Sequence, residues 1–179
     1  MDKTIKRGYK AFNADLTNRY GVPFIEGGSY SVTGPAVFGN QGNGFHFCER
    51  LEDTLRYFNA MDEDIKIALV EGSGEMVEAN DEYYGYYDMF SATELKVIRV
   101  LSRSEIVDMF GSAPGFRTVR FVQGFKLTDA EKAWLKFKHI DNTDVLKAID
   151  YYQDGDKEAY SPEKAIVYMK RAREYYNSI

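Results

Sequence analysis

The sequence has little cysteine and little histidine. Cys48 is the single cysteine among 179 residues, so an intrachain disulfide and a zinc site built from cysteines are both excluded. The two histidines, His46 and His139, are too few for a three-histidine metal site. We expect neither a metal nor a cofactor. A lone thiol also fits a reducing compartment, which predicts a cytoplasmic protein.

Long apolar runs, an excess of basic residues and low-complexity tracts are also missing. No stretch approaches the roughly 20 apolar residues of a membrane span. The first ten residues are charged and lack an apolar centre, so we expect no signal peptide. The net charge of −5 disfavours general binding of nucleic acid, because phosphates need a basic surface. Four prolines and the lack of repeats argue against disorder.

What is present is an ordinary globular composition with many aromatic residues. Hydrophobic residues make up 44% of the chain and charged residues 28%, which is typical of one domain, or of one domain with a small appended bundle. The chain has 14 tyrosines and 12 phenylalanines. Because tyrosine is costly to bury without a partner for its hydroxyl, we expect many tyrosines at rims and interfaces.

The first hundred residues have the pattern of a sheet. Alternating and β-branched residues predict strands at 5–12, 29–32, 65–71, 74–78 and 93–101. Between these strands, leucines and phenylalanine at helical spacing predict one helix over 49–59. The region 13–43 is rich in glycine and proline and is expected to be mostly turns.

The remainder of the chain has the pattern of helices. Two capping boxes, Ser102 with Glu105 and Thr128 with Glu131, predict helix starts, and Asn142 or Thr143 predicts a third. Residues 116–122 are rich in β-branched and aromatic residues and predict a further strand, and a last helix is expected over 162–177. We predict an α+β fold with a mostly antiparallel sheet in 1–111 and a mainly helical subdomain of three helices in 112–179.

Two short segments carry a family resemblance. The segment Gly8–Asn13 (GYKAFN) and the segment Gly44–Cys48 (GFHFC) resemble a family of small phage and prophage proteins. The resemblance covers roughly residues 6–101. It implies an origin in a mobile element, and hence an accessory or counter-defence role in the host cell.

His46 and Cys48 are two residues apart and would face the same side of a strand. One interpretation is a Cys-His nucleophile pair. The alternative is structural: Phe45 and Phe47 fill the core on one face, while His46 and Cys48 meet a second packed layer and His46 bonds to backbone.

A second enzymatic interpretation comes from another resemblance. A strand with a basic residue, followed by Gly-Phe-His-Phe and a helix ending in a tyrosine, is similar to ADP-ribosyltransferase-type folds. The resemblance implies a site for NAD or a nucleotide, with four candidate residues: Arg7, His46, Tyr57 and Glu94. The serine-threonine-serine triplet and the His-Gly dipeptide of those enzymes are absent from this sequence.

The segment 71–88 holds six carboxylates and four tyrosines without any lysine or arginine. It is either a solvated hairpin or a surface that binds a basic protein, since tyrosines give contact area and carboxylates pair with arginine or lysine. The candidate contact residues are Glu75, Glu78, Asp81, Glu82, Tyr83, Tyr84, Tyr86, Tyr87 and Asp88.

The expected last helix has the opposite charge. Lys164, Lys170, Arg171 and Arg173 could touch RNA or DNA, although core packing and the helix dipole explain the same pattern. We therefore expect a protein that binds and inhibits a host defence factor, most concretely an anti-CRISPR protein acting on a Cas9-type nuclease with its guide RNA. The alternatives are an enzyme like the ADP-ribosyltransferases and a structural or morphogenetic phage protein.

Overall fold

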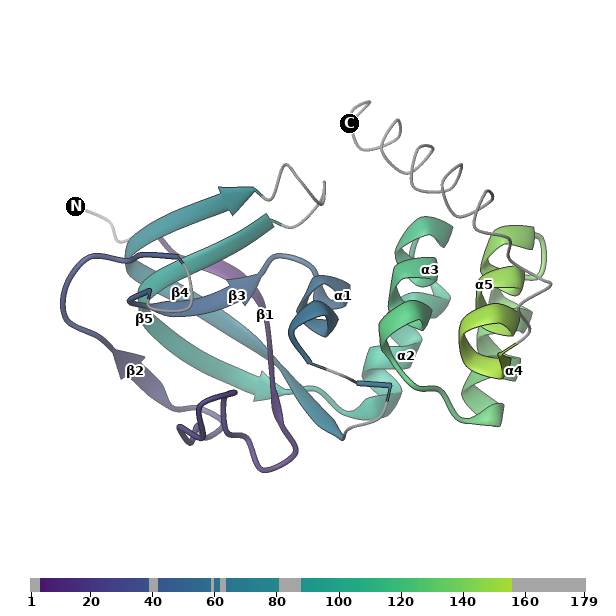
Figure 1. The fold of residues 1–179 in the computed structure, drawn as a ribbon, viewed down its shortest axis with the longest axis horizontal. Helices are drawn as coiled ribbons and strands as arrows, with labels where there is room; N and C mark the ends of the chain where they lie inside the picture. The colour runs from purple at the N-terminus through teal and green to yellow at the C-terminus, as the bar shows by residue number, and fades with distance from the viewer. Residues whose placement is uncertain (1–3, 39–41, 59, 62–63, 81–87, 156–179) are drawn as a thin grey trace. The chain divides into compact units, whose positions relative to one another are not determined.

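The computed structural model describes residues 4–38, 42–58, 60–61, 64–80 and 88–155. The chain divides into two compact units, Met1–Ser102 and Arg103–Ile179. All five strands lie in the first unit and the longer helices lie in the second, which confirms the α+β fold with helices in the C-terminal part (Figure 1). The chain divides after Ser102, whereas the sequence placed the boundary after Gly111.

The first unit is an antiparallel sheet that closes on itself. Its strands are β1 (Lys6–Asn13), β2 (Ser29–Ser31), β3 (Phe45–Cys48), β4 (Ile65–Asn80) and β5 (Asp88–Val100). They run in the order β2-β5-β3-β1-β4, and β4 also pairs with β5. Within the run β5-β3-β1-β4, the two end strands are β5 and β4. Because these two strands also pair with each other, the sheet closes and encloses a core (Figure 1).

Strands β4 and β5 form the longest hairpin of the unit. The sequence predicted two strands at 65–71 and 74–78, and both belong to the single strand β4. The ladder with β5 shifts register between Ser73 and Met76, where Gly74 has a φ of 79°. A bulge of this kind bends a strand and increases its twist, which helps a small sheet to close.

Aromatic rings fill the enclosed core. Phe12, Phe47 and Phe90 are almost fully buried from three different strands, and Phe24 joins them from the loop after β1. The Phe47 and Phe90 rings stack with centroids 5.3 Å apart. Period-two alternation in β5 places Leu95 and Val97 in the same core.

The helix between β3 and β4 is shorter than expected. The spacing predicted a helix over 49–59, but the structure has one turn of α-helix, α1 (Leu51–Thr54), followed by the 3₁₀ turn η1 (Leu55–Tyr57). Leu51 and Leu55 are buried, as expected for leucines at helical spacing on one face. The backbone then turns extended at Phe58, where the helical pattern ends.

The second unit is a group of helices: α2 (Arg103–Gly111), α3 (Gly115–Gly124), α4 (Asp129–Lys138) and α5 (Thr143–Asp154). The expected strand at 116–122 is wrong, because these residues form α3. Thr118, Val119, Phe121 and Val122 are buried, which is the helical spacing of one face. The β-branched residues that suggested a strand are tolerated because their burial outweighs their weak helix propensity.

Local signals fixed the starts of α4 and α5. Thr128 and Glu131 form the expected capping box at α4, and the Asn142 side chain accepts hydrogen bonds at the start of α5. The Gln153 side chain then joins α5 to the chain before α4: it donates to the Phe125 carbonyl at 3.0 Å and accepts from the Leu127 amide at 2.9 Å. No helix in the described part of the chain is long and apolar enough to cross a membrane.

Candidate functional site

The closed sheet has one weak seam, between β1 and β3. In the described residues these strands pair at a single position, Tyr9 with Cys48. By contrast, β1 pairs with β4 along its whole length, and β3 pairs with β5 at all four residues. Past Tyr9, β1 therefore leaves its neighbour β3, and the sheet opens there.

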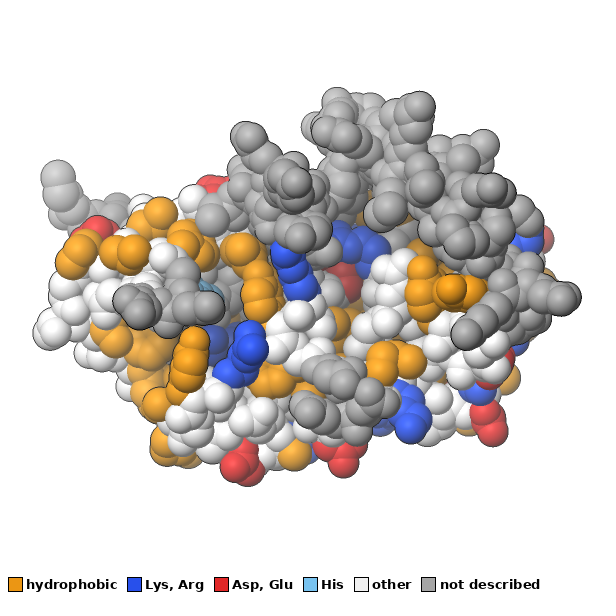
Figure 2. All heavy atoms as spheres, viewed as in Figure 1, with side chains coloured by type: hydrophobic (Ala, Val, Ile, Leu, Met, Phe, Trp, Pro, Cys, Tyr) orange, Lys and Arg blue, Asp and Glu red, His pale blue; other side chains and the backbone are white. Residues whose placement is uncertain are grey.

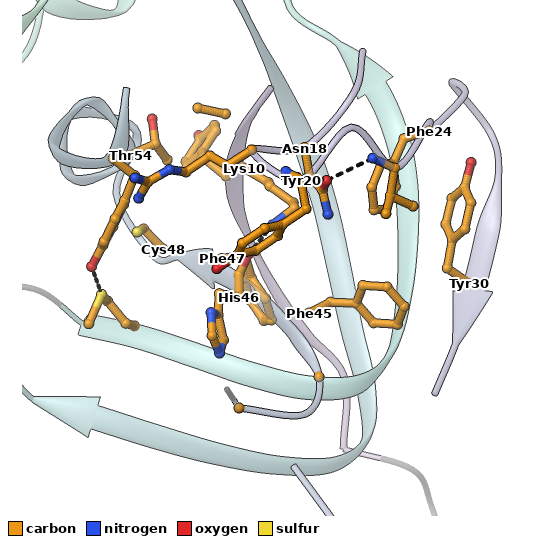
Figure 3. A pocket seen from close by; sticks show the side chains of 18 of the residues that line it. Lys10, Asn18, Tyr20, Phe24, Tyr30, Phe45, His46, Phe47, Cys48 and Thr54 are labelled. Atoms are coloured by element: carbon orange, nitrogen blue, oxygen red, sulfur yellow. Dashed lines mark hydrogen bonds between the residues drawn. The ribbon is translucent and has the colours of Figure 1, made fainter. Parts of the chain in front are cut away.

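A cavity of about 970 Å³ lies at this opening, and we call it the seam cavity. Figure 3 shows the Phe24, Tyr30 and Phe45 rings together at one end, and Cys48 and Thr54 at the other. The volume lies within the range of small-molecule sites, which are mostly apolar with a few convergent polar groups. Its described polar lining residues include Lys10, Asn18, Arg19, His46, Cys48 and Tyr57.

Lys10 occupies the gap in the seam. Its ammonium donates a hydrogen bond of 2.7 Å to the His46 carbonyl, in place of the ladder bond that β1 would otherwise give β3. Its charge lies 5.7 Å from the centre of the Phe12 ring. Burial lowers the pKa of Lys10 to about 8, because the charged form loses its hydration, and only the nearby Cys48 thiol opposes the change.

His46 is held flat against an aromatic ring. Its imidazole stacks on Phe38 with centroids 5.2 Å apart and an interplanar angle of 14°. Burial and the charge of Lys10 lower the pKa of His46, against a backbone hydrogen bond with Val37. Both effects favour the neutral imidazole. Its Nε2 is buried and has no hydrogen-bond partner in the described residues.

Two asparagines shape the loops that border the seam cavity. The Asn18 carboxamide oxygen accepts from the Tyr20 and Val22 amides, both at 2.9 Å. The Asn43 side chain donates to the carbonyls of Thr33 and Pro35, at 3.0 and 2.9 Å. Each loop is thus folded onto its own asparagine, as expected for residues that favour turns.

The rim of the seam cavity is apolar and open to solvent. Tyr20 is 76% exposed and Val22 49% exposed, and both line the cavity. Figure 2 shows hydrophobic side chains on the face of the first unit, with basic side chains among them. Exposed apolar groups around a hollow of this size are typical of a binding site.

The charges at the seam cavity have one sign. Lys10 and Arg19 line it, and none of its described lining residues is an aspartate or a glutamate. Neither Lys10 nor Arg19 has an ion-pair partner within the part of the chain that the structure describes. This is unusual for a chain with a net charge of −5, and it makes the cavity suitable for an anion.

The seam cavity lies in a segment that known proteins share. Residues 6–109 match a family described as a domain of unknown function, DUF7666. The chain belongs to this family. No curated protein and no solved structure matches the chain.

The DUF7666 match includes both motifs that the sequence singled out. Lys10 lies in the GYKAFN segment and His46 in the GFHFC segment, and the structure places these segments on the two strands of the seam. The family description gives no function, so the phage origin and the counter-defence role stay predictions. Within the DUF7666 segment, the motifs meet at the cavity and at the hydrogen bond between Lys10 and His46.

The structure brings together two of the four residues expected for an ADP-ribosyltransferase-like site. His46 and Tyr57 both line the seam cavity, and the Tyr57 hydroxyl donates to the Met89 sulfur. Arg7 instead pairs with Glu71 at 2.8 Å on the outside of the sheet. Glu94 accepts a hydrogen bond of 2.9 Å from Ser73 and lines a smaller hollow of about 380 Å³. Neither Arg7 nor Glu94 lines the seam cavity.

The two interpretations of His46 and Cys48 both stay predictions. Phe47 lies in the core with Phe45 packed against it, and His46 bonds to the Val37 backbone, as the structural interpretation expected. Yet His46 and Cys48 also line the seam cavity. Lys10, which links the two motifs, was missed as a site residue by the sequence reasoning.

The charged segments lie mostly outside the described residues. Of the acidic segment, Glu75 and Glu78 lie on β4 with exposed side chains. Asp88 begins β5. Six of its other candidates fall outside the described residues: Asp81, Glu82, Tyr83, Tyr84, Tyr86 and Tyr87. The basic candidates Lys164, Lys170, Arg171 and Arg173 also fall outside them, as does the expected helix over 162–177.

Proposed function

We propose that this DUF7666 protein binds a small ligand that joins a planar ring to an acidic group, such as a mononucleotide or an aromatic acid. The observation that carries the proposal is Lys10: its ammonium lies in an aromatic-lined cavity with no carboxylate to neutralise it among the described residues. A partly buried charge without a partner is costly, and an anionic ligand removes that cost.

The remaining lining fits the other half of such a ligand. Tyr30 and Phe45 offer ring faces at one end of the seam cavity, with centroids 6.4 Å apart. Rings favour offset or tilted contacts with other rings, so a planar group is bound better there than a branched aliphatic group. Arg19 at the rim supplies a second cation for an acid with more than one charge.

The test compares ligands that differ only in their charge. Isothermal titration calorimetry with naphthoate against naphthamide, and with AMP against adenosine, separates the acid from the ring. We expect the acid of at least one pair to bind. Lys10→Met should weaken its binding by about tenfold to a hundredfold, the value of one charge-assisted hydrogen bond.

Lys66→Met is the matched control, because Lys66 is exposed on β4 and does not line the seam cavity. It should leave the affinity unchanged. Equal binding of each acid and its neutral partner, or equal affinity in Lys10→Met and the native chain, contradicts the proposal. Circular dichroism of each variant confirms that the sheet has formed.

A second candidate function is the inhibition of a Cas9-type nuclease, favoured by one observation. Glu75 and Glu78 are both exposed on β4 and extend the acidic segment onto an ordered strand. Carboxylates on a rigid strand can compete with phosphates for a basic channel. On this proposal the chain binds the guide-loaded nuclease near one to one.

Charge reversal tests this second candidate. We expect the double variant Glu75→Lys, Glu78→Lys to lose inhibition of DNA cleavage by a guide-loaded Cas9-type nuclease. The double variant Asp64→Lys, Asp141→Lys has the same net charge, changes two exposed carboxylates elsewhere, and should keep it. Absence of inhibition by the native chain, or loss in both variants alike, contradicts a specific acidic surface.

A further inference from the structure

Lys10 has the surroundings of a reactive amine. It lies on the same face of β1 as Phe12, which belongs to the core, so its stem passes over apolar groups. One N–H is held by the His46 carbonyl at 2.7 Å. That bond fixes the position of Nζ in the seam cavity and leaves the rest of the nitrogen free to meet a ligand.

The same surroundings favour the neutral amine, which is the nucleophilic form. Loss of hydration lowers the pKa of Lys10 to about 8, so a substantial fraction is neutral near physiological pH. A desolvated lysine in an apolar pocket is the usual setting in which proteins use this side chain as a nucleophile. Of the described ionisable side chains, only the Cys48 thiol acts against the lowering.

We propose that Lys10 forms a reversible imine with an aromatic aldehyde bound in the seam cavity. The nitrogen lone pair adds to the carbonyl carbon, and the carbonyl π electrons move to oxygen. One proton passes from nitrogen to oxygen to give a carbinolamine, the C–O bond then breaks as nitrogen forms the C=N bond, and a second proton from nitrogen goes to the departing oxygen, which leaves as water. One amine and one aldehyde give one imine and one water, and nothing is oxidised or reduced.

The inference rests on the proposed function, because both use the same cavity and the same lysine. The aldehyde takes the position at Nζ that the acidic group takes in the non-covalent complex. The planar ring occupies the aromatic end in both cases, near Tyr30 and Phe45. An acid of the same ring should therefore compete with the aldehyde for Lys10.

The experiment traps the imine. The full chain is incubated near pH 7 with substoichiometric naphthaldehyde and cyanoborohydride, which reduces an imine to a stable amine, and labelled lysines are located by peptide mass spectrometry. We expect Lys10 to be labelled at least about tenfold faster than the exposed Lys66, because its neutral form is more abundant. Lys10→Arg should remove this fast adduct, and excess naphthoate should slow it.

The outcomes separate the two proposals. Equal labelling of Lys10 and Lys66 overturns the imine while naphthoate binding by calorimetry still supports the proposed function. Fast labelling of Lys10 that neither naphthoate nor AMP slows, when neither acid binds by calorimetry, supports the imine and overturns the acid-binding function. Absence of selective labelling together with absence of binding of both acids overturns both. Reaction at Cys48 gives a hemithioacetal that cyanoborohydride does not trap as an amine, so it is not mistaken for the imine.

Discussion

Raising the pH from about 7 to about 9.5 is expected to stabilise the first unit by up to about 2 kcal/mol, relative to the Lys10→Met variant. The pKa of Lys10 is about 8 in the folded chain, against 10.5 for an ordinary lysine. Between these two values the unfolded chain binds more protons than the folded chain. The free energy of unfolding therefore rises with pH in this range. Below the pKa of the folded chain, Lys10 is protonated in both states and adds no pH dependence.

The measurement is a set of urea unfolding curves followed by far-UV circular dichroism, taken at several pH values for the native chain and for Lys10→Met. The difference between the two free energies of unfolding cancels the titration of groups that both chains share. The Cys48 thiol interacts with Lys10 and raises the pKa of Lys10, so the pair is repeated in a Cys48→Ser background. Lys66→Met should follow the native chain at every pH. A difference that stays constant contradicts the desolvation of Lys10.

The same test bears on function. If the ammonium without an ion-pair partner lowers the stability of the ligand-free chain, its proposed role in binding an acid explains why a lysine is found at this position. Sites of binding and catalysis commonly carry such a cost, because the groups that recognise a ligand are poorly matched to an empty pocket. A bound acid should recover the cost at neutral pH, where Lys10 is charged, and recover less of it as the amine loses its proton.

Local patterns predicted most of the elements of the fold. Period-two alternation located β1 and β5, and capping residues located the starts of α4 and α5. The failure at α3 shows the limit of propensity. Its β-branched residues favour a strand in isolation, but the buried positions 118, 119, 121 and 122 follow the period of a helix packed on one face.

The seam cavity could not be predicted in the same way. Its walls come from β1, β2, β3, the short helices α1 and η1, the start of β5 and the loops after β1 and β2. Their meeting depends on β1 pairing with β3 at one position only. A sequence does not show which strand pair of a closed sheet is the short one. One signal was nevertheless present: Lys10 lies two residues before Phe12, so the alternation of β1 places a lysine on the face that enters the core.

Gly8→Ala is expected to cost about 3 kcal/mol of the free energy of unfolding, and to abolish binding of naphthoate. A Cβ at Gly8 would overlap the Cys48 carbonyl oxygen, at a distance that non-bonded Cβ atoms essentially never show. The Phe47 ring would also lie too close to it. The carbonyl belongs to the backbone of β3 and cannot rotate away as a side chain could. The strands must separate at Tyr9 and Cys48, their only described pairing.

The consequence extends to the site because β1 carries Lys10 two residues further along. If β1 moves from β3, Nζ loses the His46 carbonyl, and the cavity loses the wall that positions its cation. Gly27→Asn is the control: its neighbourhood is open and its φ is 78°, a conformation that asparagine tolerates, so we expect a change within about 1 kcal/mol. Unfolding curves and naphthoate titrations of both variants check the prediction. A Gly8→Ala chain that keeps its stability and its affinity would show that β3 yields without opening the seam, and that the cavity does not depend on this contact.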